Sequence, residues 1–279
     1  MILCYYNGEF KDIKECMIPA TDLIVQRGCG VFDSMITYNR RVFAMDYHLK
    51  RLARSAKLSN MNADAIIDQL PDIIHEGIKS PLLPQDKELM IRPYITAGDV
   101  NKKGVFPNPR FFVIFEETHA VTPEMRTNGV SLKPVYAKRQ MAEVKSINYM
   151  TAYVAMANSE ATDFESLYIL DGEIAEATSS SFFIVKDGKL ITAPVGKVLR
   201  SVTREVVFTI CQENGIEIEE RSPREEELKT ADEAFIAASS KEVLGIVKVG
   251  DVVIGNGKVG ELTKRIHKLF LDNVYRWTE

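Results

Sequence analysis

The chain has 279 residues, near the size at which a single hydrophobic core stops growing, so two domains are expected rather than one. Its 46% apolar and 27% charged residues are ordinary for a globular protein, and a formal net charge of -4 argues against nucleic acid as the main partner. No apolar run approaches the ~18 residues of a membrane span and no signal peptide is evident, which predicts a cytoplasmic protein without a membrane partner.

The first part of the chain predicts a sheet with helices packed on it. Asn7-Gly8 stands between two short strand-like runs and is a strong hairpin signal, because both residues tolerate positive φ. Apolar spacing then predicts two helices followed by two strands, at 46–58, 63–79, 89–96 and 110–116. Pro71 has no backbone N–H to donate, so it must kink or split the second helix.

The pattern breaks at residues 117–127, which are interpreted as a linker. The predicted domains are therefore a smaller one at 1–116 and a larger one at 128–279. Turns at Asp171-Gly172 and Asp187-Gly188 indicate hairpins in the second domain.

Three further elements are expected towards the C-terminus. A helix over 201–213 ends at Asn214-Gly215, a favourable C-cap. Ser222-Pro223-Arg224-Glu225 has the pattern of a capping box at a helix start, and an amphipathic helix closes the chain. The predicted fold class is α+β.

The cysteines give no sign of a metal site. They have no CxxC or CxxH spacing, so no metal is predicted, and the thiols are expected to be free and buried: Cys4, Cys16, Cys29 and Cys211.

Two segments carry the residue types that pyridoxal phosphate (PLP) chemistry needs. Lys145 precedes a predicted helix within residues 143–149, and Glu176 ends a predicted strand within residues 172–181. A lysine can form a Schiff base with an aldehyde, and an acid can keep a pyridine nitrogen protonated. Alone, the lysine is more simply a solvated surface charge.

Other segments would suit the phosphate of such a cofactor. Residues 199–204 open a helix with small hydroxylated side chains, and Ser239 and Ser240 follow a predicted strand. Arg51 lies beside the apolar stripe of its helix. Taken one at a time, these features are more simply an N-cap, a polar strand end and an arginine that snorkels over apolar surface.

Together, six segments resemble the class IV (fold type IV) PLP-dependent aminotransferases, a superfamily of D-amino-acid and branched-chain aminotransferases that also includes aminodeoxychorismate lyase. In chain order they are RGCGVFDS at 27–34, HLKRL at 48–52, EVKSINY at 143–149, EIAEATSSSFFIVKDGKLITAP at 173–194, LRSVTRE at 199–205 and ASSKEV at 238–243. The resemblance covers nearly the whole chain. It implies a smaller N-terminal α/β domain and a larger, β-barrel-like C-terminal domain with flanking helices.

The resemblance also implies roles for single residues. Lys145 would be the catalytic Schiff-base lysine, and Glu176 would pair with the pyridine nitrogen. The remaining cofactor-binding residues would be Arg51, Tyr149, Leu199, Val202, Thr203 and Ser239. The substrate would be bound by Arg27, Arg92, Ser240 and Lys241.

Two departures from the family pattern affect neither the lysine nor the glutamate. Ser181 stands where the family has asparagine, and Ser201 stands where a glycine commonly precedes the phosphate-binding helix. Because the family completes its active sites across a dimer, the chain is expected to form a homodimer with shared active sites, in which Arg27 reaches the partner subunit's site.

Two arginines bear on the identity of the substrate, Arg27 and Arg92. Arg27 and Arg92 resemble the arginine pair with which some D-amino-acid transaminases bind the substrate carboxylate, so an enzyme of the D-alanine type is slightly favoured. The alternatives are a branched-chain L-amino-acid aminotransferase and aminodeoxychorismate lyase, which eliminates pyruvate. A structural salt bridge is the less favoured explanation of the two arginines.

Overall fold

The computed structural model describes residues 2–118, 121–157, 159–160 and 163–279. Two compact units are present, and each is discontinuous in sequence. Unit 1 is Met1–His119, Val144–Asn148 and Tyr275–Glu279, and unit 2 is Ala120–Glu143 and Tyr149–Val274. The chain thus returns to unit 1 at the segment that carries Lys145, a return that apolar periodicity does not predict. Of the predicted linker at 117–127, residues 119 and 120 lie outside the described residues.

Unit 1 is built on a seven-stranded sheet in which all pairings are antiparallel. Its order is β2 (Glu9–Asp12), β1 (Leu3–Tyr6), β7 (Arg110–Glu117), β6 (Leu89–Thr96), β4 (Met35–Tyr38) and β5 (Arg41–Val42), with β3 (Gly30–Phe32) also paired to β6. The predicted hairpin is confirmed, because Asn7 and Gly8 turn between β1 and β2 with φ of 53° and 86°.

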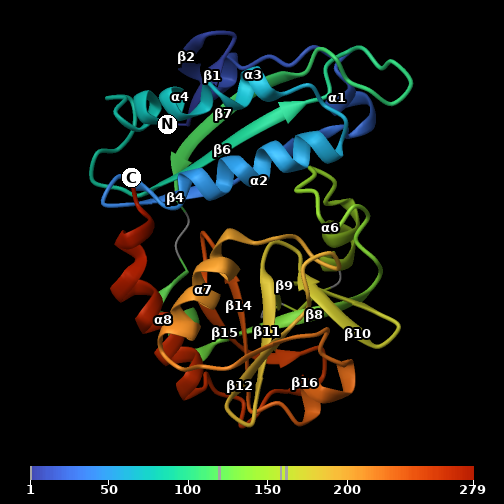
Figure 1. The fold of residues 1–279 in the computed structure, drawn as a ribbon, viewed down its shortest axis with the longest axis vertical. Coiled ribbons are helices and arrows are strands. Elements are labelled where there is room, and N and C mark those ends of the chain that lie inside the picture. Colours follow the sequence, from blue (N-terminus) through green and yellow to red (C-terminus); the bar gives the residue numbers. More distant parts are fainter. Residues whose placement is uncertain (1, 119–120, 158, 161–162) are drawn as a thin grey trace. The chain divides into compact units, whose positions relative to one another are not determined.

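Helices cover one face of this sheet (Figure 1). They are α2 (Met45–Leu58), α3 (Asp64–Ile67) and α4 (Leu70–Ile78), while α1 (Leu23–Arg27) precedes β3. Leu52 of α2 and Ile74 of α4 share one buried cluster with Ile91 of β6 and Phe115 of β7. The predicted split at Pro71 is also confirmed: Pro71 lies in the first turn of α4, where no N–H is required.

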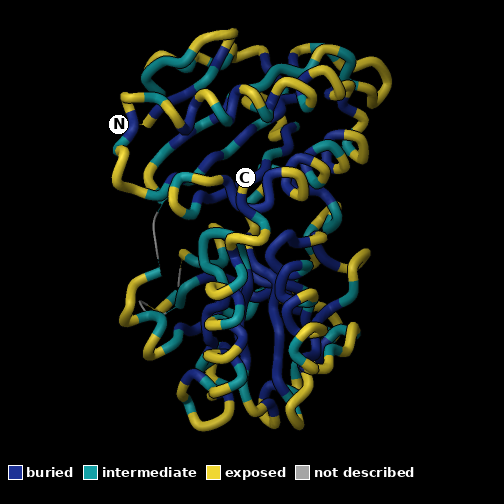
Figure 2. The backbone as a smooth tube through the Cα atoms, turned by 60° about the vertical axis from the view of Figure 1, so that its left-hand side comes forward, coloured by how far each residue is buried: buried dark blue, intermediate teal, exposed yellow. Residues whose placement is uncertain are grey.

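Unit 2 contains a nine-stranded mixed sheet. The order is β10 (Glu173–Ala177), β9 (Asp163–Leu170), β8 (Val130–Tyr136), β15 (Glu242–Val249), β14 (Glu233–Ala238), β11 (Ser181–Lys186), β12 (Lys189–Thr192) and β13 (Ile218–Glu220), with β16 (Val252–Val253) paired to β15. Strands of both units are mostly buried, whereas the turns between them are exposed (Figure 2).

The helices of unit 2 are α5 (Pro123–Asn128), α6 (Met150–Met156), α7 (Val202–Glu213) and α8 (Glu261–Asn273). Helices α7 and α8 contact each other and also strand β14. The helix predicted at 201–213 is confirmed as α7, with Ser201 as its N-cap and Asn214 as its C-cap. The α+β class is confirmed as well.

The capping box predicted at Ser222 is wrong. Residues 222–224 are not helical: the Ile174 N–H donates to the Pro223 carbonyl at 2.8 Å, and Glu173 bridges to Arg224, whose backbone is extended. The short 3-10 helix that follows, Glu225–Lys229, has Arg224 as its N-cap instead. Pairing with β10 therefore overrode the local signal.

The four cysteines are free, as expected, but only Cys4 and Cys211 are buried. The expected burial is wrong for Cys16 and Cys29, which follow a short 3-10 helix and α1 and are partly exposed.

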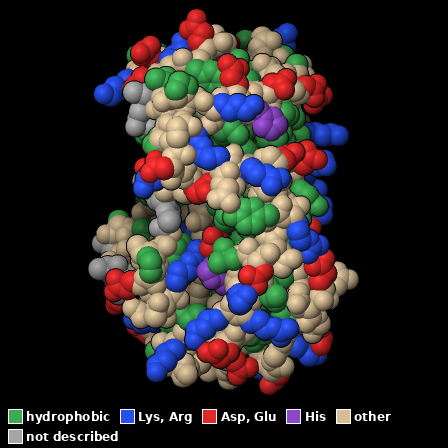
Figure 3. Space-filling view, turned by 90° about the vertical axis from the view of Figure 1, so that its left-hand side faces the viewer, with side chains coloured by type: hydrophobic (Ala, Val, Ile, Leu, Met, Phe, Trp, Pro, Cys, Tyr) green, Lys and Arg blue, Asp and Glu red, His purple; other side chains and the backbone are tan. Residues whose placement is uncertain are grey.

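Across the described ranges, no helix is long and apolar enough to span a membrane. Nor do three His, Cys, Asp or Glu side chains of those ranges gather as metal ligands would. On the face shown in Figure 3, Lys and Arg alternate with Asp and Glu and form no single basic patch.

Candidate active site

Helix α2 presents a polar row beside its apolar stripe. His48, Arg51 and Ser55 are spaced by three and four residues and therefore share one side of the helix. His48 and Ser55 are fully buried, which is unusual for polar side chains without partners. His48 contacts Asp33 and Ser55 contacts Lys145, and both partners lie outside α2 in unit 1.

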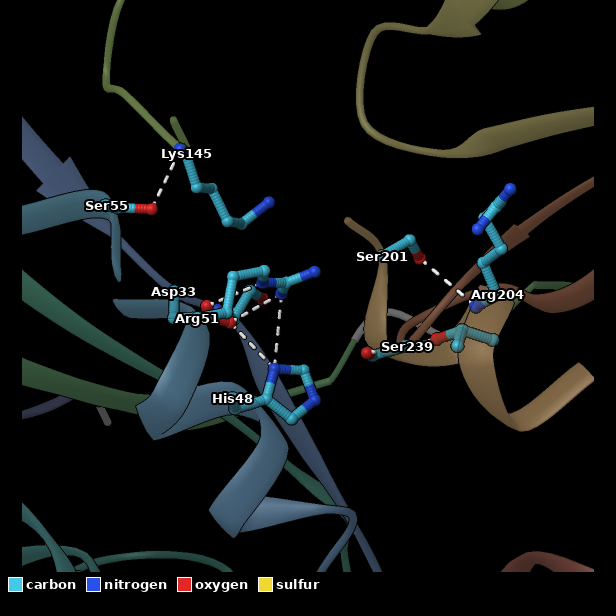
Figure 4. A network of polar contacts seen from close by, with 10 residues as sticks. Asp33, His48, Arg51, Ser55, Lys145, Ser201, Arg204 and Ser239 are labelled. Carbon is cyan, nitrogen blue, oxygen red and sulfur yellow. Dashed lines mark hydrogen bonds and ion pairs between the residues drawn. The ribbon is translucent and has the colours of Figure 1, made fainter. Parts of the chain in front are cut away.

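Asp33, which directly follows β3, binds two members of this row (Figure 4). Its Oδ2 accepts from Arg51 Nε at 2.8 Å, and its Oδ1 accepts from Arg51 Nη2 at 2.7 Å. Oδ1 also lies 2.7 Å from His48 Nδ1. The guanidinium predicted to bind phosphate is thus held by a bidentate carboxylate that sequence reasoning missed.

The ionisation states of this group follow from burial and charge. Burial opposes the charged form of Asp33, but the charges and hydrogen bonds of Arg51 and His48 outweigh it and hold the pKa of Asp33 well below its ordinary value. Burial lowers the pKa of His48, and the positive charges of Arg51 and Lys145 lower it further. The negative charge and the hydrogen bond of Asp33 raise this pKa but do not outweigh the other effects. The folded structure therefore favours the neutral imidazole of His48.

Lys145 is fixed through its backbone on both sides. Its N–H donates to Ser55 Oγ at 3.1 Å, and its carbonyl accepts from the Phe32 N–H at 3.0 Å. The next residue, Ser146, bridges to Val31 of β3. Lys145 is only 8% exposed, and its Nζ lies 4.7 Å from the centroid of the Phe32 ring. A lysine buried to this degree is rare outside functional sites.

Arg92 lies on the sheet face opposite the helices. On that face Phe32, Tyr94 and Phe112 stack in a row, with ring centroids 5.3 Å and 4.8 Å apart. Arg92 Nη2 pairs with Glu116 Oε1 at 2.5 Å, and its buried Nε has no hydrogen-bond partner among the described residues. This ion pair with Glu116 is what the alternative explanation of Arg92, a structural salt bridge, predicts.

Arg27 is the last residue of the short helix α1 and is exposed. Buried Asp22 caps this helix by accepting from the Ile24 N–H at 2.9 Å. Arg27 Nη1 donates to the Gln26 carbonyl at 2.8 Å. The structure thus presents Arg27 at the surface of unit 1.

In unit 2, Glu176 lies in β10 and is 5% exposed. Its Oε2 accepts from the backbone N–H of Leu199 at 3.1 Å, and its Oε1 pairs with Arg139 Nη1. Arg139 was not singled out by sequence reasoning, since residues 137–141 have no periodic or motif signal. Two of the predicted cofactor-binding residues, Glu176 and Leu199, are therefore in contact, and Arg139 also contacts Glu176.

The N-terminus of α7 gathers hydroxyl groups. Ser201 Oγ accepts from the Arg204 N–H at 3.3 Å (Figure 4). Thr203 Oγ1 lies 3.3 Å from Ser239 Oγ. Thr203 is fully buried, and Val202 forms the first turn of the helix. Three of the predicted phosphate-binding residues, Val202, Thr203 and Ser239, thus lie close to one another.

Lys241 has partners that the sequence did not indicate. Its Nζ donates to Glu165 Oε1 at 3.0 Å, Ser179 Oγ at 2.6 Å and Ser180 Oγ at 3.0 Å. Burial opposes ionisation of Glu165, but the Lys241 charge and the hydrogen bonds of the two serines lower its pKa overall. Lys241 therefore ties the turn after β14 to the turn after β10.

The two other predicted residues of unit 2 lie at ends of elements. Ser240 lies in the turn between β14 and β15. Tyr149 immediately precedes α6, with its ring centroid 6.5 Å from that of Tyr153.

Residues 30–249 match the family described as amino-transferase class IV. This chain belongs to the class IV aminotransferase family. A Methanocaldococcus jannaschii protein assigned as a branched-chain-amino-acid aminotransferase is 30% identical to it over 98% of this chain and 96% of its own. The D-alanine aminotransferase of Bacillus licheniformis is 28% identical over 96% of each chain.

A solved structure shows the same fold. The T.th. branched-chain amino acid aminotransferase with pyridoxamine 5'-phosphate has a TM-score of 0.90 at 22% identity, over 99% of this chain and 97% of that one. The expected fold type IV architecture is thereby confirmed. As a class IV aminotransferase the protein is a PLP-dependent transaminase, which confirms the predicted enzyme class and cofactor.

The residue types present fit PLP. Unit 1 supplies a buried primary amine, Lys145, and a guanidinium held in one orientation, Arg51. Unit 2 supplies a buried carboxylate, Glu176, and a helix N-terminus with the hydroxyls of Thr203 and Ser239. Amine, acid, phosphate donors and helix end are the groups that this cofactor requires.

Proposed function

We propose that this class IV aminotransferase moves the amino group between a D-amino acid of the D-alanine type and a 2-oxo acid. The observation that carries the proposal is the presence of arginine at both Arg27 and Arg92. The similarity to D-alanine aminotransferases over nearly the whole chain supports it. The planar guanidinium of arginine can donate hydrogen bonds to both oxygens of a carboxylate, which compensates for the water that the carboxylate loses on binding.

Lys145 would hold PLP through its amine and, once that amine is free, would move the proton at the substrate Cα. Bound PLP supplies an electron sink for the negative charge that develops at Cα. Glu176 would pair with the ring nitrogen of bound PLP, and its carboxylate also contacts Arg139. The residues that would hold the phosphate of PLP are Arg51, Val202, Thr203 and Ser239. Leu199 would contact the ring, and Tyr149 would donate a hydrogen bond to it.

In this proposal Arg92 binds the substrate carboxylate while it is also paired with Glu116. A wholly structural arginine would ordinarily satisfy its buried donors, whereas Arg92 Nε has no partner among the described residues. This unmet donor supports a role for Arg92 beyond the ion pair. Ser240 and Lys241 are also proposed to serve substrate binding. Lys241 would do so indirectly, by holding together the turns after β10 and β14.

The protein is further proposed to act as a homodimer, with Arg27 serving the partner subunit's site. Arg27 is exposed on unit 1. Helix α6 also exposes apolar side chains, with Met150, Tyr153 and Val154 at 70%, 74% and 64% exposure. Contiguous exposed apolar residues are typical of surfaces that another chain covers.

Branched-chain L-amino-acid aminotransferase is the second candidate. The 30% identity to the Methanocaldococcus jannaschii protein favours it. Both candidates share the cofactor, so they differ only in how the substrate is held.

A panel of D- and L-amino acids separates the two candidates. Each amino acid is added to the PLP form without an acceptor, and the loss of the cofactor's absorbance band is followed. D-alanine and D-glutamate are expected to react fastest. Activity confined to L-leucine, L-isoleucine and L-valine would reject the D-specific proposal and favour the branched-chain one.

Borohydride reduction tests the proposed lysine. It should fix PLP on the peptide that contains Lys145 and abolish activity. Label on a different lysine would refute the proposed site.

A further inference from the structure

A fully buried carboxylate holds the proposed phosphate arginine, although no chemical step uses it. Asp33 contacts Arg51 through both oxygens, at 2.8 Å to Nε and 2.7 Å to Nη2. The Asp33 side chain is 0% exposed and that of Arg51 is 10% exposed. Two parallel hydrogen bonds fix the plane of a guanidinium, which a single contact does not.

Asp33 is itself fixed by its surroundings. Its backbone N–H donates to the Pro93 carbonyl of β6 at 3.0 Å, and its Oδ1 also contacts His48 Nδ1. The orientation of the guanidinium is therefore set by the sheet and not by the flexible arginine stem. Burying two ionised groups has a large desolvation cost, so such a pair is weak evidence of a purely stabilising role.

We propose that Asp33 is a positioning residue, which orients Arg51 so that its guanidinium meets the phosphate of PLP. The inference rests on the proposed role of Arg51 in the function described above. Arginine binds phosphate through the directed N–H groups of its planar fork, so a rotated guanidinium keeps its charge but loses this geometry. Asp33 should therefore contribute to PLP affinity only through the phosphate.

The test compares two ligands that differ by that phosphate. Protein freed of cofactor is titrated with PLP and with pyridoxal, and binding is followed by absorbance. Asp33→Asn keeps the size of the side chain but removes its charge. PLP affinity should fall about 10- to 100-fold, as is typical when the group behind a binding residue is lost, while pyridoxal affinity should change less than about threefold.

Asp22→Asn is the matched control. Asp22 is also a fully buried carboxylate of unit 1, and it pairs with an arginine, Arg110, at 3.0 Å. Losing its charge should lower stability but leave the ratio of PLP to pyridoxal affinity at the wild-type value. This ratio is insensitive to a general loss of folding, because both ligands need the same folded protein.

Two results with Asp33→Asn would overturn the inference: an unchanged PLP affinity, or equal losses for PLP and pyridoxal. If circular dichroism shows that this variant does not fold, Arg51→Lys replaces it, since lysine keeps the charge without the fork. That variant should show the same selective loss, and a wild-type ratio in it would equally overturn the inference.

A different result would reject the proposed phosphate role of Arg51, on which the inference rests. A wild-type protein that binds PLP no better than pyridoxal would reject the phosphate role of Arg51 itself. Normal wild-type discrimination with no selective effect in Asp33→Asn would reject only the role of Asp33.

Discussion

Arg92 and Glu116 form a contact that a substrate carboxylate would have to share. The two side chains are 29% and 14% exposed, so neither charge is fully screened by water. If Arg92 binds the carboxylate, the negative Glu116 competes with the substrate for the same guanidinium.

Opposite substitutions at this pair should therefore have opposite effects on substrate binding. Arg92→Ala should reduce kcat/KM for amino acids by about 30- to 1000-fold, or roughly 2–4 kcal/mol of transition-state binding. Glu116→Gln should lower KM for the same substrates, because it removes the competing charge. Steady-state kinetics measure both variants.

Uncharged amines without a carboxylate are the control substrates and should lose little in Arg92→Ala. A purely structural pair predicts another pattern, in which both variants lose stability and keep the wild-type kcat/KM for amino acids.

The titration of His48 makes the free energy of unfolding depend on pH in a range where Asp33 and Glu165 do not titrate. In the folded protein burial lowers the pKa of His48 below the ordinary value of 6.5, which favours the neutral imidazole. The unfolded chain takes up this proton below about pH 6.5, so stability should fall as pH drops, by up to about 1.4 kcal/mol per pH unit. Asp33 and Glu165, whose pKa values are also lowered, lose their contribution only at more acidic pH.

Urea unfolding at several pH values between about 5 and 8 measures this dependence. In His48→Gln the slope over this window should be smaller, even though the variant is less stable overall. An unchanged slope would show that His48 is not the group that takes up the proton.

At the scale of elements, α4 approaches the sheet at a glycine. Gly77 is buried, and a Cβ added there would overlap the ring of Phe115 on β7. The absence of a side chain is what lets the helix pack this closely.

Gly77→Ala should therefore destabilise unit 1, by about 1–3 kcal/mol, as overpacked cores do. At an exposed helix position the same change would stabilise by up to about 1 kcal/mol, so the sign distinguishes the two environments. Urea unfolding gives the value. The cost should shrink in a Phe115→Leu background, and equal costs in the two backgrounds would place the strain elsewhere.

At the scale of the whole molecule, the proposed sharing of active sites between two subunits has a direct consequence. An Arg27→Ala chain and a Lys145→Ala chain should each be inactive as homodimers. In the mixed dimer one of the two sites keeps both residues, so mixing the inactive chains after unfolding should restore part of the activity.

Size-exclusion chromatography and differently tagged chains establish whether mixed dimers form. Mixed dimers that form and remain inactive would place Arg27 and Lys145 in the same subunit's site. A monomeric, active protein would reject the homodimer altogether.

The sequence alone determined most of the local structure and the enzyme class. The turn at Asn7-Gly8, the split at Pro71 and helix α7 follow from φ preferences and apolar spacing, which depend on residues a few positions apart. The family followed from six motifs whose order the chain preserves. Local reasoning was wrong at Ser222, because the two residues after it pair with β10 and the helix starts later in the chain.

Only the tertiary structure decided which charged groups meet. Asp33 with Arg51, Arg139 with Glu176 and Lys241 with Glu165 are separated by 18, 37 and 76 residues, and no periodic pattern links them. An ion pair needs two side chains to converge in space, whereas a helix or strand pattern records only which face is buried. The return of residues 144–148 to unit 1, which fixes Lys145 between β3 and Ser55, depends on the same long-range convergence.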